Sequence, residues 1–310
     1  EHVKRMRSGL EISYGDKVED PIMGGEIKIP VNAMSPQEFK EGADVVLLCV
    51  KSQYTRDALA PVLSISKSAP IVSLQNGINE EQIAELVGEE RVFGCVIFWG
   101  GTNLGPGHLK QTAEGGITIG KWPGGSSPAT EDIARMLNKV APTDVSTHIK
   151  GDLWTKLLIN VSMTGTGAIA GYTYGEVLDD ELALRIALTV LTEAYNVGEV
   201  LGTNFEKIMG VDPSAIVALI QNDYSFASEI IRAAFSRNRD TKPSLLQDIE
   251  KGRKTEINFL NGYVVKKARE VGIRAPANEM ISNLVKELEA GKRLPSVGNL
   301  RGLRGMLVPY

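Results

Sequence analysis

The sequence predicts an α/β fold in which a doubly wound, mostly parallel sheet is followed by an all-α C-terminal domain. In the first half, short apolar segments typical of strands alternate with segments of helical spacing, the order found in parallel sheets. From about residue 151 only amphipathic helical patterns follow. At about 150 residues per domain, 310 residues suggest two domains. We place them at 1–150 and 151–290, with a C-terminal tail at 291–310.

Three apolar runs in the first half predict buried strands. ADVVLLCVK (43–51) is nearly continuous, as expected of a strand covered on both faces. PIVSLQNG (70–77) ends in an Asn-Gly turn, and RVFGCVIFWGG (91–101) is the third run. HLKQTAEGGITIGKW (108–122) predicts a further pair of strands joined by a Gly-Gly turn.

Helical segments separate these strands. TRDALAPVLSI (55–65) has helical spacing. INEEQIAELVG (78–88) carries acids near its start and Gly88 after its end, which matches the preferences of helix termini. SSPATEDIARMLNKVAP (126–142) has Pro128 near its start.

The second half consists of five amphipathic segments and a tail. The tail KRLPSVGNLRGLRGMLVPY is rich in Gly and Pro, and we expect an extended arm. Within 181–202, the apolar stretch 181–194 could line a subunit contact in a homodimer, although burial inside the helical domain explains it better. The predicted helices are 154–171, 181–202, 213–225, 244–272 and 276–291.

Composition excludes several classes of protein. A net charge of −4 and a pI of about 5.6 argue against a nucleic-acid or anionic-membrane partner. The longest apolar runs, such as VVLLCV, are far shorter than a membrane span of about 20 residues. Cys49 and Cys95 lie in strand-like runs, and two buried thiols suit a reducing cytoplasm. The three histidines show no metal-ligand spacing, so we expect no metal site.

A polar stripe interrupts the apolar segment WTKLLINVSMTG (154–165). Lys156, Asn160 and Thr164 are spaced by four residues, which stacks them on one face of a helix. Lys156 could simply extend its ammonium to solvent from the edge of a buried helix. Three hydrogen-bonding side chains in a row instead indicate a wet cleft, where a lysine can donate a proton.

A second polar residue breaks the apolar pattern of 244–270, which we predict as one long helix. Glu256 lies seven residues after Ile249 and four before Leu260, on the inward stripe. A surface acid paired with Lys254 or Arg253 is the simpler reading. A carboxylate on the apolar stripe, however, needs a partner or a chemical role.

Polar residues also follow two predicted strands. Asn76 and Gly77 end one strand, and Lys51, Ser52 and Gln53 follow another. Ligands of open α/β sheets bind at these carboxyl ends. The Asn-Gly pair by itself indicates only a tight turn. The sequence contains no GxGxxG, GxxxxGK[ST] or GxSxG motif.

Taken together, these segments resemble the ketopantoate reductase (2-dehydropantoate 2-reductase) family. The resemblance runs in order from residue 10 to about 290 and is specific in combination. It implies an N-terminal NADP-binding Rossmann-type domain, a helical substrate domain and an active site between them. The matching segments are DVVLLCVKSQ, IVSLQNGINEEQIAEL, GGITIG, LWTKLLINVSMTGTGAIAG and SLLQDIEKGRKTEINFLNGYVVKKAREVGI.

The resemblance also implies roles for individual residues. Lys156 matches the catalytic lysine, which protonates the ketone oxygen of a 2-oxo acid as NADPH delivers hydride. Glu256 matches a catalytic-site acid that binds the substrate hydroxyl and balances charge. Asn76 matches the asparagine between the nicotinamide ribose and the substrate. Asn160, Thr164 and Ser244 match substrate-binding positions, with Ser244 near the carboxylate, and Lys51 and Gln53 match the cofactor cleft.

The sequence departs from the family pattern in two places. Thr164, followed by GTGAIAG, replaces the family's second asparagine, and we expect the glycines to loosen that wall. The chain opens within an apparent helix, EHVKRMRSG. We therefore expect the family's GxGxxG loop, first helix, second strand and reader of the 2′-phosphate to precede residue 1. These residues alone do not distinguish NADP from NAD.

The leading interpretation is NADPH-dependent reduction of ketopantoate to pantoate in pantothenate and coenzyme A synthesis, in the cytoplasm. One alternative is a paralogous reductase of another branched 2-oxo acid, of the D-2-hydroxyacid dehydrogenase type. A second alternative is a non-catalytic cofactor-binding protein. The presence of both Lys156 and Glu256 argues against it, because a binder needs no lysine in an apolar helix.

Overall fold

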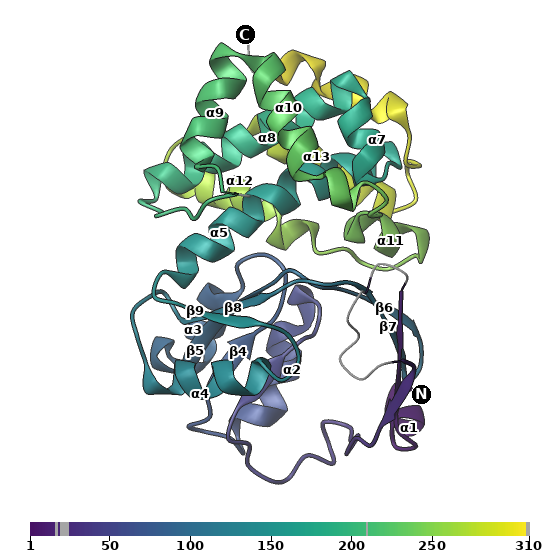
Figure 1. Cartoon of the computed structure of the whole chain (residues 1–310), viewed down its shortest axis with the longest axis vertical. Coiled ribbons are helices and arrows are strands. Elements are labelled where there is room, and N and C mark those ends of the chain that lie inside the picture. Colours follow the sequence, from purple (N-terminus) through teal and green to yellow (C-terminus); the bar gives the residue numbers. More distant parts are fainter. Residues whose placement is uncertain (16–17, 19–24, 209, 308–310) are drawn as a thin grey trace. The chain divides into compact units, whose positions relative to one another are not determined.

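The computed structural model describes residues 1–15, 18, 25–208 and 210–307 (Figure 1). The chain forms two compact units. The first consists of Glu1–Gln75 and Glu80–Ile149. The second consists of Lys150–Tyr310 together with the short loop Asn76–Asn79.

The larger sheet of the first unit has the strand order β3-β4-β5-β8-β9. β3, β4 and β5 are parallel, β8 and β9 are parallel, and β5 and β8 are antiparallel. This arrangement confirms the predicted α/β fold with a mostly parallel, Rossmann-type sheet. In chain order its strands are Val46–Leu48, Ile71–Ser73, Val92–Ile97, Ile117–Lys121 and Thr143–Ser146.

A second sheet has the order β2-β1-β7-β6, formed by Ile27–Ile29, Leu10–Tyr14, His108–Ala113 and Gly100–Gly105. The predicted pairing within 108–122 is wrong, because β7 pairs with β1 and β6 whereas β8 pairs with β5 and β9. Gly115 explains the difference. A Cβ atom there would lie 2.5 Å from the Phe98 carbonyl oxygen, so this glycine lets the chain cross between two sheets.

Helices cover the larger sheet. α4 packs on one face, where Ile133, Ala134 and Leu137 meet strand residues such as Phe93 and Cys95 (Figure 1). Strand residues of the opposite parity point to the other face, and α3 also contacts β5. The helical segments are α1 (His2–Met6), η1 (Ser52–Tyr54), α2 (Thr55–Leu63), α3 (Glu80–Val87), η2 (Glu89–Arg91) and α4 (Pro128–Leu137).

The strand predicted at 43–51 is not covered on both faces. Leu48 is buried, but Leu47 is 40% exposed and Val50 is 37% exposed. Cys49 is exposed, so the expectation of two buried thiols holds only for Cys95. The reason is the position of β3, which has a hydrogen-bonded neighbour on one side only within the described sheet.

The second unit is helical, as predicted, and its described residues contain only one isolated bridge, between Ile208 and Val211. α8 runs through its centre, and most of the stretch 181–194 is buried there. The segments are α5 (Ile149–Ile159), η3 (Asn160–Thr164), α6 (Gly165–Ala170), α7 (Tyr174–Asp179), α8 (Glu181–Val200), α9 (Pro213–Asn222), α10 (Tyr224–Ala234), η4 (Ser236–Asn238), α11 (Ser244–Glu250), η5 (Ile257–Phe259), α12 (Asn261–Glu270), α13 (Pro276–Glu289) and η6 (Val297–Met306).

The long helix predicted at 244–270 is wrong, because α11 ends after Glu250 and α12 begins at Asn261. Gly252 has a φ of 61°. Its amide donates to the Ile249 carbonyl, and the Arg253 amide donates to the Asp248 carbonyl. This pair of bonds is a Schellman motif, which ends a helix at a glycine in the left-handed conformation.

The tail is not an extended arm over 297–306, where it forms the 3-10 segment η6. Leu300 and Leu303 are fully buried. Asn299 donates from Nδ2 to the Ile169 carbonyl at 2.8 Å and to the Leu294 carbonyl at 3.0 Å. Apolar burial and these two hydrogen bonds hold the segment against the helical unit.

Glu193 joins the central helix to α13. Its carboxylate accepts hydrogen bonds from the backbone amides of Ala277 and Asn278, each at 2.9 Å. These amides belong to the first turn of α13, where no intrahelical acceptor exists and an anion is favoured. Burial nevertheless raises the pKa of Glu193 above 4.5.

We expect Glu193 to make stability depend on pH. Because its pKa is raised in the folded protein, the protonated carboxyl favours folding below the unfolded pKa, and this contribution is lost as pH rises through the folded pKa. Glu193→Gln removes the titration. With rising pH, the unfolding free energy of the variant should therefore increase relative to that of the wild type. The increase is about 1.4 kcal/mol for each unit by which the pKa of Glu193 differs between the folded and unfolded protein.

Urea unfolding of both proteins from pH 4 to 8 measures this gain. Glu229→Gln, at an exposed position on α10, controls for removal of a surface carboxylate. Parallel curves for wild type and Glu193→Gln would contradict the prediction.

Candidate functional site

Trp154 sets the rotation of α5 and thereby the direction of Lys156. The indole is fully buried, and its ring packs against Phe205 and Tyr263 with centroids 6.4 and 5.8 Å away. Two residues correspond to about 200° around an α-helix, so Lys156 leaves the opposite side. Lys156 is half-buried, whereas Leu157 and Leu158 are fully buried.

The predicted three-residue polar stripe is broken by η3, which is a π-turn over Asn160–Thr164. A π-turn closes i→i+5 hydrogen bonds, so it displaces the following side chains around the axis relative to an α-helix. Asn160 stays half-buried, but Thr164 is only 3% exposed and its hydroxyl lies 3.0 Å from the Tyr174 hydroxyl. Lys156 and Asn160 therefore remain on the more accessible side, while Thr164 belongs to the core.

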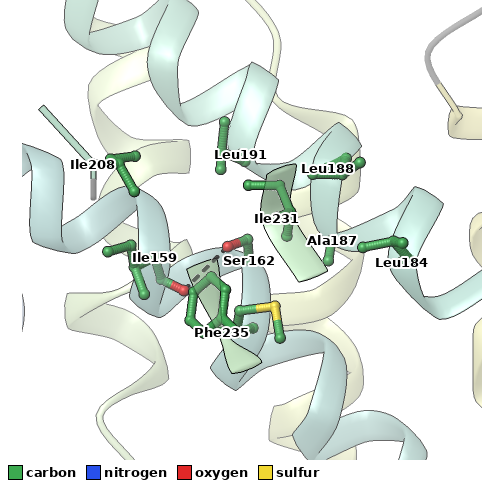
Figure 2. A pocket seen from close by; sticks show the side chains of 10 residues that line it. Ile159, Ser162, Leu184, Ala187, Leu188, Leu191, Ile208, Ile231 and Phe235 are labelled. Carbon is green, nitrogen blue, oxygen red and sulfur yellow. Dashed lines mark hydrogen bonds between the residues drawn. The ribbon is translucent and has the colours of Figure 1, made fainter. Parts of the chain in front are cut away.

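Ser162 stabilises the π-turn from within. Its hydroxyl donates to the Leu158 carbonyl at 2.8 Å and approaches the Ile159 carbonyl at 3.1 Å. Such bonds from serine to the preceding turn satisfy carbonyls that an irregular helix would otherwise leave unpaired. Figure 2 shows Ser162 turned back toward its own helix, beside a cavity.

That cavity is not a substrate site. Its volume is about 10 Å³, at the lower limit for one water molecule. Its walls are apolar apart from Ser162, whose hydroxyl is already engaged (Figure 2). We interpret it as a packing gap beside the π-turn. Its lining residues are Ile159, Ser162, Met163, Leu184, Ala187, Leu188, Leu191, Ile208, Ile231 and Phe235.

The glycines after Thr164 do not loosen a wall, contrary to expectation. A Cβ atom at Gly165 would lie 2.8 Å from Ile281 Cγ2 and 2.9 Å from Asn261 Oδ1. At Gly167 it would lie 2.6 Å from Pro243 Cγ. Both glycines are fully surrounded, because they let neighbouring helices approach the backbone of α6 closely.

These contacts bring Ser244 toward the π-turn that holds Asn160, within the second unit. Pro243, against Gly167, is followed by Ser244, the half-buried first residue of α11. α11 also contacts the π-turn that begins with Asn160. Glu256 lies just before η5 and is only 4% exposed, so the simpler reading of a surface acid is wrong and the inward position holds, although the predicted helix does not.

The loop Asn76–Asn79 belongs to the same unit. Gly77 has a φ of 83°, and a Cβ atom there would collide with the carbonyl oxygen of Phe259. Asn79 is fully buried and donates from Nδ2 to the Asn76 carbonyl at 2.9 Å. Asn76 is thus held on a rigid loop next to η5, the segment that follows Glu256.

Lys51 and Gln53 lie in the first unit, where β3 ends. Gln75, at the end of β4, donates from Nε2 to the Val50 carbonyl at 2.8 Å and to the Thr55 hydroxyl at 2.9 Å. Thr55 in turn donates to the Ser52 carbonyl at 2.8 Å. This clamp fixes the turn that carries Lys51 and Gln53 beside the carboxyl end of the neighbouring parallel strand.

Sequence reasoning missed the residues that support the site, namely Gln75, Asn261, Asn278 and Glu193. Only Glu193 gave a signal, as an acid within a largely apolar helix, whereas Gln75 follows a strand and the two asparagines lie in the first turns of amphipathic helices. Asn261 and Asn278 are fully buried, and Asn261 reaches the carbonyl of Val161 inside the π-turn. A partner a hundred residues away in the sequence leaves no trace in local spacing.

The described residues hold neither a metal-ligand cluster nor a membrane-spanning helix. Among them, no three His, Cys, Asp or Glu side chains cluster so as to hold a metal ion. No helix in the described ranges is both long enough and apolar enough to traverse a bilayer.

Comparison with known families agrees with this architecture. The model of ketopantoate reductase PanE/ApbA matches residues 11–124, and the model of ketopantoate reductase PanE/ApbA C terminal matches residues 148–289. The class of protein is therefore that of an oxidoreductase. The chain belongs to the ketopantoate reductase PanE/ApbA family, which confirms the resemblance read from its motifs.

Individual relatives are consistent with this assignment. The chain is 32% identical over 249 residues to 2-dehydropantoate 2-reductase from Pyrococcus horikoshii, covering 80% of this chain and 76% of the relative. The crystal structure of a PanE/ApbA family ketopantoate reductase from Ralstonia eutropha JMP134 is 25% identical with a TM-score of 0.77, covering 94% of this chain and 88% of that one.

A structure of D-mandelate dehydrogenase with NADH and anilino(oxo)acetate has a TM-score of 0.76 at 20% identity. The match covers 94% of this chain and 88% of the dehydrogenase. At this identity the likeness shows the fold alone.

Replacing Gly77 by Ala should destabilise the helical unit more than the same change at Gly252. Both glycines have positive φ, at 83° and 61°, so each substitution pays a conformational cost of roughly 1–2 kcal/mol. Only at Gly77 does the new Cβ also meet a backbone oxygen, whereas nothing lies within 4 Å at Gly252. The extra cost should be about 1–3 kcal/mol.

Urea unfolding of the two variants measures the difference directly. Equal losses at both positions would show that the Asn76–Asn79 loop is not packed against Phe259.

Proposed function

We propose that the protein reduces 2-dehydropantoate (ketopantoate) to pantoate with NADPH as the hydride donor. The observation that carries the proposal is the position of Lys156, the half-buried lysine that leaves α5 opposite the Trp154 anchor. The relative from Pyrococcus horikoshii, named 2-dehydropantoate 2-reductase, supports the substrate. Pantoate formation would place the protein in pantothenate and coenzyme A synthesis.

In this proposal Lys156 is the general acid. Hydride addition to the ketone carbon leaves negative charge on its oxygen, and a lysine ammonium within hydrogen-bond reach stabilises that charge and transfers a proton to it. NADPH supplies the hydride when bound and is oxidised to NADP⁺. The ketone thus becomes a secondary alcohol, with its new C–H bond from the cofactor and its new O–H bond from Lys156.

The other polar residues of the second unit bind and orient the substrate. Glu256 accepts a hydrogen bond from the hydroxyl group of 2-dehydropantoate, and Ser244 donates to its carboxylate. Asn160 and Asn76 contribute amide groups, with Asn76 placed next to the nicotinamide ribose. All of them belong to the second unit, where α11 contacts η3 and Gly77 lies against Phe259 of η5. Thr164 has no direct role in this scheme, because its hydroxyl lies against Tyr174 in the core.

The first unit fits a nicotinamide dinucleotide at the carboxyl ends of β3 and β4. The turn held by Gln75 carries one cation, Lys51, and one amide side chain, Gln53, and these groups suit phosphate and ribose oxygens. Lys51 and Gln53 would hold the cofactor there. NADPH is the nucleotide that the resemblance implies, whereas NADH accompanies the D-mandelate dehydrogenase fold neighbour, so both nucleotides belong in the test.

One observation favours a second candidate, a reductase of another branched 2-oxo acid. Where the resemblance places a second substrate-binding asparagine, this chain has Thr164, which is buried and engaged by Tyr174. The site therefore offers one polar group fewer to the substrate hydroxyl. A substrate without that hydroxyl would lose less binding free energy from the missing polar group.

We retain the cytoplasm as the expected location and a homodimer as the expected assembly to test.

Replacing Lys156 by Ala should lower kcat for 2-dehydropantoate by about 10²–10⁴-fold, because the general acid is lost. The measurement is NADPH oxidation at 340 nm with full-length protein, repeated with NADH and with a panel of branched 2-oxo acids. Lys150→Ala, on the same helix, is the matched control and should leave kcat within about twofold.

Brisk turnover of 2-dehydropantoate that only the Lys156 variant loses supports the proposal. Turnover of other branched 2-oxo acids but not of 2-dehydropantoate would favour the second candidate function. Tight NADPH binding without oxidation of any of these acids would leave a non-catalytic binding protein.

Glu256→Gln should raise KM for 2-dehydropantoate by roughly 10–100-fold, since a hydrogen bond to a charged group contributes about 1.5–3 kcal/mol. Binding of NADPH should change little. Glu250→Gln serves as control, because Glu250 is exposed at the end of α11 and paired with Lys242. A Glu256 variant with unchanged KM and a lowered melting temperature would assign this carboxylate a structural role instead.

A further inference from the structure

We propose that Asn261, Asn278 and Glu193 are positioning residues that hold the π-turn and thereby set Asn160 for substrate binding. The inference rests on the proposed function, because it deepens the role given there to Asn160. It adds three residues that lie outside the substrate-binding set and act through the backbone. All of them belong to the second unit.

The chain of contacts begins at the π-turn. Asn261, the first residue of α12, donates from Nδ2 to the carbonyl oxygen of Val161 at 3.1 Å. The same nitrogen donates to Asn278 Oδ1 at 3.0 Å. Both amide protons of Asn261 are therefore used. The orientation of its amide is defined, because the reversed amide would face two acceptors with an oxygen.

The network continues through α13 to the central helix. Asn278 donates from Nδ2 to Glu193 at 2.9 Å and to the Val190 carbonyl at 3.1 Å. Glu193 also accepts the backbone amides of Ala277 and Asn278. Asn261 and Asn278 are both fully buried. Four helical segments, η3, α8, α12 and α13, are thus joined by one buried polar network, in which each bond polarises the next.

Gly165, on the adjacent helix α6, leaves the space that the Asn261 side chain occupies. Asn261 Oδ1 and Ile281 Cγ2 occupy the space that any Cβ at position 165 would need. A larger residue there would push Asn261 away from Val161. The glycine that follows the π-turn is therefore a condition for the network.

The network acts on Asn160 rather than on Lys156. Val161 follows Asn160 directly within the π-turn. A hydrogen bond to the Val161 carbonyl fixes the Val161–Ser162 peptide unit, and only the Asn160–Val161 peptide unit separates it from the α-carbon of Asn160. A π-turn inside a helix persists when a side chain or another element supplies the missing partners. Lys156 lies upstream in α5, where Trp154 fixes the rotation. Loss of the network should therefore affect substrate binding more than proton donation.

The test is a double-mutant cycle between Asn261→Ala and Asn160→Ala. Asn261→Ala should raise KM for 2-dehydropantoate about tenfold and change kcat less than threefold. If Asn261 acts through Asn160, the double variant should be no worse than Asn160→Ala alone, within about twofold in kcat/KM. Additive losses in the cycle would overturn the inference.

Asn299→Ala is the matched control. Asn299 is also a buried asparagine that donates to backbone carbonyls of the helical unit, at Ile169 and Leu294, but not to the π-turn. It should lower the melting temperature while leaving KM within about twofold. An equal rise of KM in this variant would attribute the effect to general destabilisation.

Hydrogen exchange tests, without any measurement of enzyme turnover, whether Asn261 holds the π-turn in place. Peptides covering 157–166 should exchange at least tenfold faster in Asn261→Ala, and not in Asn299→Ala. If wild type reduces no 2-oxo acid, the proposed function fails while this result still stands or falls on its own. If Asn261→Ala does not fold, Asn278→Ala tests the same path, because it removes an acceptor of Asn261 and the link to Glu193. Unchanged exchange in both variants would overturn the inference.

Discussion

The irregular turn at Asn160–Thr164 is the constraint on which the helical unit depends. It allows one continuous segment to point Lys156 and Asn160 away from the core while Thr164 packs against Tyr174. Such a turn costs free energy, and the surrounding elements compensate for it. Ser162 pairs with carbonyls of the preceding turn, and Asn261 pairs with Val161 from another helix. The neighbouring glycines keep those elements close.

In the first unit, the polar groups of the sheet are positioned in a different way. Strands β3, β4 and β5 end at one edge, and the side chain of Gln75 positions the turn with polar groups that follows β3 there. A buried amide with defined acceptors is an efficient way to align two strand ends, because leaving it unpaired would cost about 1–3 kcal/mol. Both units thus place their candidate functional groups by means of buried amides that do not themselves take part in the proposed chemistry.

Most element types could be predicted from the sequence, because apolar periodicity reports the face that a helix or strand buries. The errors have specific causes. The break in 244–270 depends on the left-handed conformation of Gly252, which the helical pattern of the segment does not reveal. The local order of 108–122 predicts a hairpin, whereas Gly115 lets the chain pass into another sheet. Cys49 follows β3 and is exposed, and β3 is an edge strand within the described sheet, a position that depends on the whole sheet.

The sequence by itself determined the family, the α/β and all-α halves, and the candidate residues Lys156, Glu256 and Asn76, because motif order and residue chemistry are local properties. Only the tertiary structure decided which of those residues face outward and what supports them. Thr164 left the predicted stripe because a π-turn changes the helical register. Asn261 supports the π-turn because folding brings its side chain to the carbonyl of Val161, a hundred positions away in the sequence. Contacts of that kind arise from packing, and no local pattern in a single sequence encodes them.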